Sequence, residues 1–230
     1  TALSGDGGGL LIENGAQPIL DHIVIAGNAA YHGGGIYANS HLRLNNVFVL
    51  NNTATGACGG VFGQSSAIVT DSRFENNQGP NAGGMWLQGG LELAETEFIS
   101  NSGGGLRVSD VGYSANIFSA RFERNSGYGL NGWGALISDT QFVSNTGYGA
   151  GFGNGDVTVI NSRFEQNTEG GLWGSRVLTI TDSTFVGNIA SYGGGVNAGY
   201  TATVSGGRFE RNTAAYYGGG LAAATLFLSG

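Results

Sequence analysis

The stretch GYGLNGWGALISDTQFVSNTGYGAGF, residues 127–152, contains the repeat that decides the fold. Gly-Tyr-Gly opens it at Gly127 and returns at Gly147, and Phe142 is followed three positions later by Asn145. Sequence periods of about 20–50 residues are typical of solenoid and other repeat proteins. In a protein of this kind the same motif recurs along the whole chain.

An apolar residue followed three positions later by asparagine recurs nine times, at spacings of 20 to 25 residues. The apolar members are Ile25, Val49, Phe74, Phe98, Phe122, Phe142, Phe164, Phe185 and Phe209. The asparagines are Asn28, Asn52, Asn77, Asn101, Asn125, Asn145, Asn167, Asn188 and Asn212. The repeat thus covers nearly the entire chain.

Two further marks recur within each unit. A glycine, usually the second of a pair, precedes an apolar residue, as in Gly129-Leu130 and Gly195-Val196. Five residues before each Phe-type position stands another apolar residue, such as Ile137 or Val159, and a further one often lies two positions earlier. Apolar residues two apart have the period of a β-strand.

Each unit is therefore predicted to hold three short strands, which cannot bury their apolar faces without neighbouring units. The fold class is an all-β, right-handed, single-stranded parallel β-helix (β-solenoid) of about ten three-strand coils, forming one domain over residues 1–230. Phenylalanines are expected to stack inside, and the asparagines to form a hydrogen-bonded ladder at a corner where they adopt left-handed geometry. The Gly-Gly corners are expected to need positive φ or close backbone approach.

Composition excludes several partners. The chain has 45 glycines, no lysine and a net charge of −7, which argues against nucleic acid and anionic membranes. No apolar stretch approaches the roughly 18 residues of a transmembrane helix. The single cysteine, Cys58, cannot form an internal disulfide and is interpreted as a small residue in a turn.

Two segments carry both repeat motifs clearly: FENNQGPNAGGMW (residues 74–86) and FVGNIASYGGGV (residues 185–196). This pattern resembles the repeat of the polymorphic outer membrane protein family, whose members are bacterial surface proteins with β-helical passengers that act as adhesins. The resemblance covers the full chain and implies an extracellular or cell-surface location. It brings no catalytic residues to this sequence.

The outward positions provide one candidate binding surface. Leu11, Tyr37, Phe62 and Trp86 occupy one column after the Gly-Gly corner, Arg107 follows, and Trp173 recurs alone. An exposed aromatic stripe of Tyr37, Phe62, Trp86 and Trp173 would suit a sugar or a protein partner. The alternative is that longer loops near the N-terminus cover it. A second outward pattern, Arg-Phe-Glu on every second coil, is interpreted as a solvated face without like-charge neighbours.

Residues capable of chemistry are scattered. Asp71, Glu95, Asp139 and Asp182 lie three residues before a Phe, where turn formation explains them better than Ca²⁺ binding or catalysis. The three histidines, His22, His32 and His41, lack the spacing of a metal site. No catalytic residue, metal or cofactor is expected. The alternative is a carbohydrate-active lyase or hydrolase, with a cleft near the insertion at residues 109–114 and Asp110, or a carbohydrate-binding module.

The ends provide a candidate self-assembly site formed by Leu3, Asp6, Leu226 and Leu228. Leu226 and Leu228 align with Ala202 and Val204 of the preceding unit, and Leu3-x-x-Asp6 matches the Phe-x-x-Asn that would come next. Head-to-tail stacking of copies, or a longer rod, would satisfy both ends. We therefore expect a non-enzymatic, extracellular structural or adhesive β-solenoid. Its expected partners are further copies or neighbouring repeats, and cell-surface carbohydrate or protein.

Overall fold

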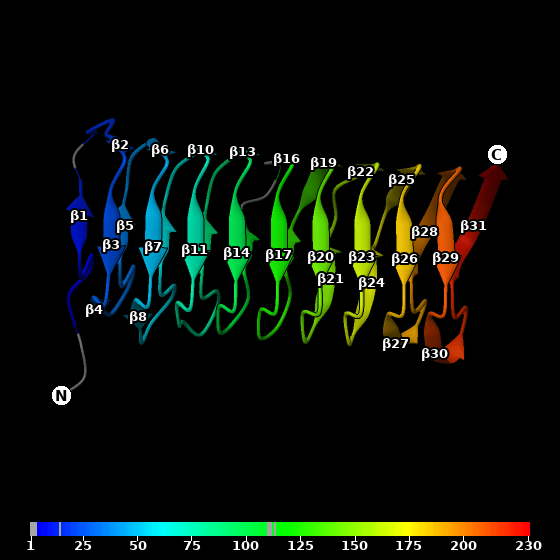
Figure 1. Ribbon diagram of the computed structural model, residues 1–230. Coiled ribbons are helices and arrows are strands. Elements are labelled where there is room, and N and C mark those ends of the chain that lie inside the picture. The colour runs from blue at the N-terminus through cyan, green and yellow to red at the C-terminus, as the bar shows by residue number, and fades with distance from the viewer. Residues whose placement is uncertain (1–3, 14, 110–111, 113) are drawn as a thin grey trace.

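The chain winds into a straight rod of stacked coils, with its two ends at opposite ends of the rod (Figure 1). The computed structural model describes residues 4–13, 15–109, 112 and 114–230. Within these residues every regular element is a β-strand, and every pair of neighbouring strands is parallel. Each coil contributes one strand to each of three sheets, called sheets 1, 2 and 3 in chain order.

Sheets 1 and 2 run along two sides of the rod. Sheet 1 contains the strands after each Gly-Gly corner: β1 (Leu10–Ile12), β5 (Ile36–Ala38), β9 (Val61–Gly63), β12 (Met85–Leu87), β15 (Leu106–Val108), β18 (Leu130–Gly132), β21 (Tyr148–Phe152) and β24 (Gly170–Gly174). Sheet 2 contains the next strands: β2 (Ile19–Asp21), β6 (Leu42–Asn45), β10 (Ala67–Thr70), β13 (Leu91–Ala94), β16 (Ser114–Phe118), β19 (Gly134–Ser138), β22 (Val157–Ile160) and β25 (Val177–Thr181). The long strands β28 (Val196–Ser205) and β31 (Leu221–Ser229) continue through both sheets and join them.

Sheet 3 carries the Phe-type residues. Its strands are β3 (Val24–Ala26), β7 (Phe48–Leu50), β11 (Arg73–Glu75), β14 (Glu97–Ile99), β17 (Arg121–Glu123), β20 (Gln141–Val143), β23 (Arg163–Glu165), β26 (Thr184–Val186) and β29 (Arg208–Glu210). Two small pairs lie in loops: β4 (Ala29–Ala30) with β8 (Thr53–Ala54), and β27 (Ile189–Tyr192) with β30 (Thr213–Tyr217). The nine strands of sheet 3 make about nine coils in the described part of the chain, one fewer than expected. The difference arises because sheets 1 and 2 extend beyond sheet 3 at the two ends.

The phenylalanines of sheet 3 form a continuous interior stack. Phe122 lies opposite Phe142 in the parallel register, and their ring centroids are 4.9 Å apart with planes inclined by 4°. The other neighbouring rings from Phe74 to Phe209 lie 4.6 to 5.0 Å apart. The sequence-based prediction of stacked coils is thereby confirmed.

The asparagine ladder is confirmed as well. Each side-chain amide donates to the Oδ1 of the asparagine one coil later, at 2.9 to 3.1 Å, from Asn28 to Asn212. The second amide hydrogen goes back to a main-chain carbonyl of the preceding coil, as from Asn145 to Phe122. The amides from Asn52 to Asn188 are fully buried, and this pairing avoids the cost of burying unbonded polar groups.

The sequence analysis expected the asparagine to adopt left-handed geometry at this corner. In the structure the residue before each asparagine adopts it instead. Positions of this kind, with φ of 52° to 55°, are Asn51, Asn76, Ser100, Arg124, Ser144, Gln166 and Arg211. The preceding residue makes the sharp turn, and the asparagine side chain is then directed inward. Left-handed geometry costs a non-glycine residue about 1–2 kcal/mol, so the ladder bonds have to offset a local strain in these coils. In two further coils Gly27 and Gly187 take this position, where the conformation costs little.

A second ladder, which the sequence analysis missed, runs along the corner between sheets 2 and 3. The hydroxyls of Ser72, Thr96, Thr140, Ser162 and Ser183 accept a main-chain N–H from the preceding coil at 3.0 to 3.3 Å. Each hydroxyl also donates to the carbonyl two residues earlier in its own coil. Buried serine and threonine thus stabilise this corner as asparagine stabilises the other.

Close backbone approach, and not positive φ, explains the glycine that precedes the strands of sheet 1, as Gly129 and Gly149 show. A Cβ on Gly149 would lie 2.7 Å from the carbonyl oxygen of Gly171, and one on Gly129 would lie 2.6 Å from that of Gly149. Neither glycine has a positive φ. Successive coils therefore pack with their main chains in contact at this corner, which excludes any side chain.

Candidate functional site

The aromatic column of sheet 1 is largely covered, which is the second of the two alternatives that the sequence left open. Tyr37, Phe62 and Trp86 do lie on successive coils in direct register. However, Phe62 is only 5% exposed, and Tyr37 and Trp86 are half-buried. The covering loops bring Ala57, Cys58 and Ala82 onto this column and form a small hydrophobic cluster.

The edges of this cluster are also occupied. The His32 ring stacks on Phe62 at 5.5 Å, and Trp86 packs edge-on against Phe62 at 5.0 Å. The Trp86 indole donates to the Ser109 hydroxyl at 2.6 Å, and the Arg107 guanidinium lies 5.0 Å from its ring centre. Trp173 is half-buried farther along the same sheet, with its ring 6.1 Å from that of Tyr148. These contacts use the ring faces that a stacking ligand would require.

The reactivity of the Cys58 thiol tests whether this cluster is covered. The thiol is fully buried, and burial raises the pKa of Cys58 to about 12. We expect the native protein to resist alkylation at pH 8, because the reactive form is the thiolate. The unfolded chain is expected to take up one equivalent of reagent, since this is the only cysteine.

The measurement is a thiol-reagent time course with and without denaturant, and fast labelling of the native protein would contradict the covered-cluster structure. The pKa of Cys58 is higher in the folded than in the unfolded protein. Its protonated thiol therefore makes its full contribution to the free energy of unfolding below about pH 9. That contribution is expected to fall as the pH rises toward 12.

The acidic residues before each Phe are corner residues. Asp71, Glu95, Asp139 and Asp182 have φ between 47° and 52°, so each turns the chain from sheet 2 to sheet 3. The histidines are bound separately: His22 to Asp21, His32 to Asp6 and His41 to Ser66. In the described residues no group of three or more His, Cys, Asp and Glu side chains is placed to hold a metal ion.

Sheet 3 presents the charged outer face. Arg and Glu two residues apart on one strand pair with each other, as in Arg73–Glu75 at 2.8 Å and Arg163–Glu165 at 2.6 Å. The Arg121 hydrogen bond, together with the charges of Arg121 and Arg124, holds the pKa of Glu123 below its usual range. In the register each of these glutamates faces Ile99, Val143 or Val186 on the next coil. This alternation separates like charges by two strand spacings, as expected.

The last described strand continues the interior columns of the coil before it. Leu226 and Leu228 of β31 pair with Ala202 and Val204 of β28, which confirms the alignment made from sequence. Ala202 and Val204 are 0% and 4% exposed, whereas Leu226 and Leu228 are 43% and 70% exposed, because no coil follows them among the described residues.

At the N-terminal end of the described residues, an open depression of about 400 Å³ is lined mainly by apolar residues of the first coil, which include Leu10, Leu20 and Ile25. Asp6 forms a parallel bridge with His32, which lies in the loop four residues after Asn28. Asp6 therefore aligns with this loop and not with the asparagine ladder, where the sequence analysis placed it. Leu3 and Asp110 lie outside the described residues.

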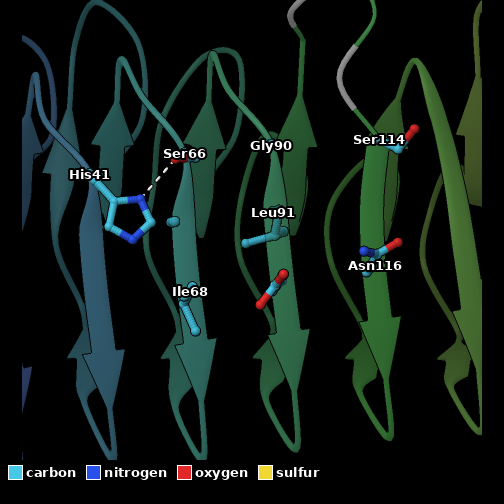
Figure 2. A pocket seen from close by; sticks show the side chains of 9 residues that line it. His41, Ser66, Ile68, Gly90, Leu91, Ser114 and Asn116 are labelled. Carbon is cyan, nitrogen blue, oxygen red and sulfur yellow. Dashed lines mark hydrogen bonds between the residues drawn. The ribbon is translucent and has the colours of Figure 1, made fainter.

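The outer side of sheet 2 carries a groove that the sequence analysis did not identify. Two adjoining hollows of about 260 and 340 Å³ share Ile68, Glu92 and Asn116. The first also reaches His41, Ser66 and Ser114 (Figure 2). The groove crosses four coils, which explains why linear motif reading does not find it.

Stacked three-strand coils with ladders at two corners define the protein as a parallel β-solenoid. A model of the right-handed β-helix region matches residues 1–135, more than half of the 230-residue chain. The chain belongs to this family, and its coils are right-handed. No curated protein and no solved structure matches the chain. In the part that the structure describes, no helix is long and apolar enough to cross a membrane.

Proposed function

We propose that this chain is a non-enzymatic structural and adhesive rod of the extracellular space or cell surface, extended by end-to-end stacking of copies. The observation that carries the proposal is the unbroken repetition of the coil, in which Leu226 and Leu228, at the C-terminal end of the described coils, continue the inward columns of Ala202 and Val204. Free strand edges recruit further strands, and burying each such leucine stabilises a contact by about 2 kcal/mol.

The occupant of this end is the first coil of a second copy. In the register of the rod, Leu20 belongs to the same inward column as Leu228, and Leu10 to the same column as Leu221. The depression around Leu10 and Leu20 is lined mainly by apolar side chains, against which Leu228 and Leu221 of another copy would pack. Such a contact joins unlike ends, so it does not close and generates a filament.

The surface location and the adhesive role rest on the repeat pattern. Phe-x-x-Asn alternating with Gly-Gly-apolar resembles the passengers of polymorphic outer membrane proteins, which are surface adhesins. In this proposal a rod of regular cross-section holds binding surfaces away from the cell, and its partners are further copies and cell-surface carbohydrate or protein.

Association is tested by light scattering and electron microscopy over a range of protein concentrations. The unmodified chain is expected to form rods that lengthen with concentration, and Leu228→Asp to remain monomeric because a carboxylate would enter an apolar stack. Ile160→Asp is the matched control, since it places the same charge on an exposed apolar site on the side of sheet 2. A monomeric unmodified chain, or assembly that Leu228→Asp leaves intact, would overturn the proposal.

A further inference from the structure

The groove on sheet 2 has a regular plan set by strand register. On β10, β13 and β16 the outward residues align in rows: Ile68, Glu92 and Asn116 form one row, and Thr70, Ala94 and Phe118 the next. Ser66, Gly90 and Ser114 line the groove just before them. The central strand presents small residues, Gly90 and Ala94, on either side of Glu92, so the surface is lowered there along the strand.

The dimensions of the depression follow from strand geometry. The stretch from residue 90 to residue 94 spans about 13 Å, and the flanking strands stand about 10 Å apart. The two hollows of about 260 and 340 Å³ meet over Glu92. The surface therefore fits a short, extended ligand lying along β13.

The centre of the groove carries a carboxylate and an amide, Glu92 and Asn116. Glu92 is exposed, and none of the ion pairs among the described residues involves it, whereas Glu75, Glu97, Glu123 and Glu165 on sheet 3 pair with arginines. Asn116 lies beside it in the register and offers both an amide donor and a carbonyl acceptor. At one end His41 is held by the Ser66 hydroxyl at 2.8 Å (Figure 2).

Apolar surface flanks these polar groups. Ile68 faces the groove from β10, and Phe118, which is 39% exposed, closes its other end from β16. A carboxylate and an amide between an aliphatic and an aromatic side chain match a sugar ring, which has hydroxyls at its rim and C–H groups on its faces. An anionic saccharide would be repelled by Glu92 and by the net charge of −7.

We propose that this groove binds a neutral, hydroxyl-rich saccharide along β13. The Glu92 carboxylate accepts hydrogen bonds from sugar hydroxyls, Asn116 donates and accepts beside it, and Phe118 packs against a ring face. The site lies on the outer side of sheet 2 and includes none of the residues proposed for end-to-end stacking, so it can be tested independently of that stacking. It also differs from the aromatic column of sheet 1, whose ring faces are already covered.

The test is calorimetric titration with neutral hexose and pentose oligosaccharides, compared with a polyuronate of equal length. At least one neutral oligosaccharide is expected to bind, and the polyuronate to bind more weakly. Glu92→Gln removes the charged acceptor and Ala94→Phe fills the depression, so each is expected to weaken binding about tenfold or more. Thr179→Phe, outward on β25 of the same sheet, is the control and is expected to bind like the unmodified protein.

Circular dichroism and thermal unfolding establish that each variant is folded, which is expected because both Glu92 and Ala94 point outward from sheet 2. The proposal is overturned if no neutral oligosaccharide binds, if the polyuronate binds more tightly, or if the folded groove variants keep full affinity.

Discussion

Replacing Asn145 by alanine is expected to lower the free energy of unfolding by roughly 3–6 kcal/mol. Asn145 Oδ1 accepts two hydrogen bonds from Asn125, one from its main-chain N–H and one from its side chain. Its amide donates to Asn167 and to the carbonyl of Phe122. All of these groups are buried, and alanine would leave both Asn125 donors and the Phe122 carbonyl without a partner.

The measurement is chemical denaturation followed by circular dichroism. Asn131→Ala is the control, because this half-buried asparagine donates a single long hydrogen bond, at 3.3 Å, to Gly151 on the outer side of sheet 1. Its replacement is expected to cost less than about 1 kcal/mol. Equal losses for the two variants would mean that the ladder does not carry the stability of the corner.

Replacing Phe142 by alanine is expected to cost about 3–5 kcal/mol, the range for truncating a fully buried phenylalanine. The ring stacks on Phe122 at 4.9 Å and on Phe164 at 4.6 Å, and close aromatic pairs add to the cost of the cavity. Relaxation of the neighbouring coils is limited, because strand pairing holds them at a set spacing.

Val143→Ala is the matched control on the same strand. Val143 points outward between Glu123 and Glu165, so its truncation is expected to change stability by less than about 1 kcal/mol. Because each coil contacts only its neighbours, hydrogen exchange is expected to increase most in the coils around residue 142 in the Phe142→Ala variant. A uniform increase along the rod would contradict this local coupling.

Much of the fold could be predicted because every coil buries the same kinds of side chain at the same positions of the repeat. Phe122 and Phe142 recur at the same phase, and only stacking places both in one interior. The asparagine ladder follows from the same phase. The hydroxyl ladder was also readable, since Ser72, Thr96, Thr140, Ser162 and Ser183 all stand two residues before a Phe. It was missed because serine and threonine near turns are common for other reasons.

The sequence could not decide features that depend on loops and corners. The aromatic column was placed correctly, but the choice between an exposed and a covered column depended on the loops that bring Ala57 and Ala82 onto Phe62. Asp6 was assigned to the asparagine column, but it pairs with His32, because the register at that end is set by the Gly-Gly corner and not by the Phe spacing. The left-handed corner residue varies among Gly, Asn, Ser, Arg and Gln, so its type carries no pattern.

The sequence by itself determined the class of the protein, the stacking columns and the phase of the coils, because a period of 20 to 25 residues places like side chains above one another. Only the tertiary structure decided which surfaces are available. Phe62 is covered and Glu92 is exposed, and the groove over Glu92 joins residues from four coils. The physical reason is that stacking is set by local repetition, whereas exposure depends on where loops of unequal length fold back.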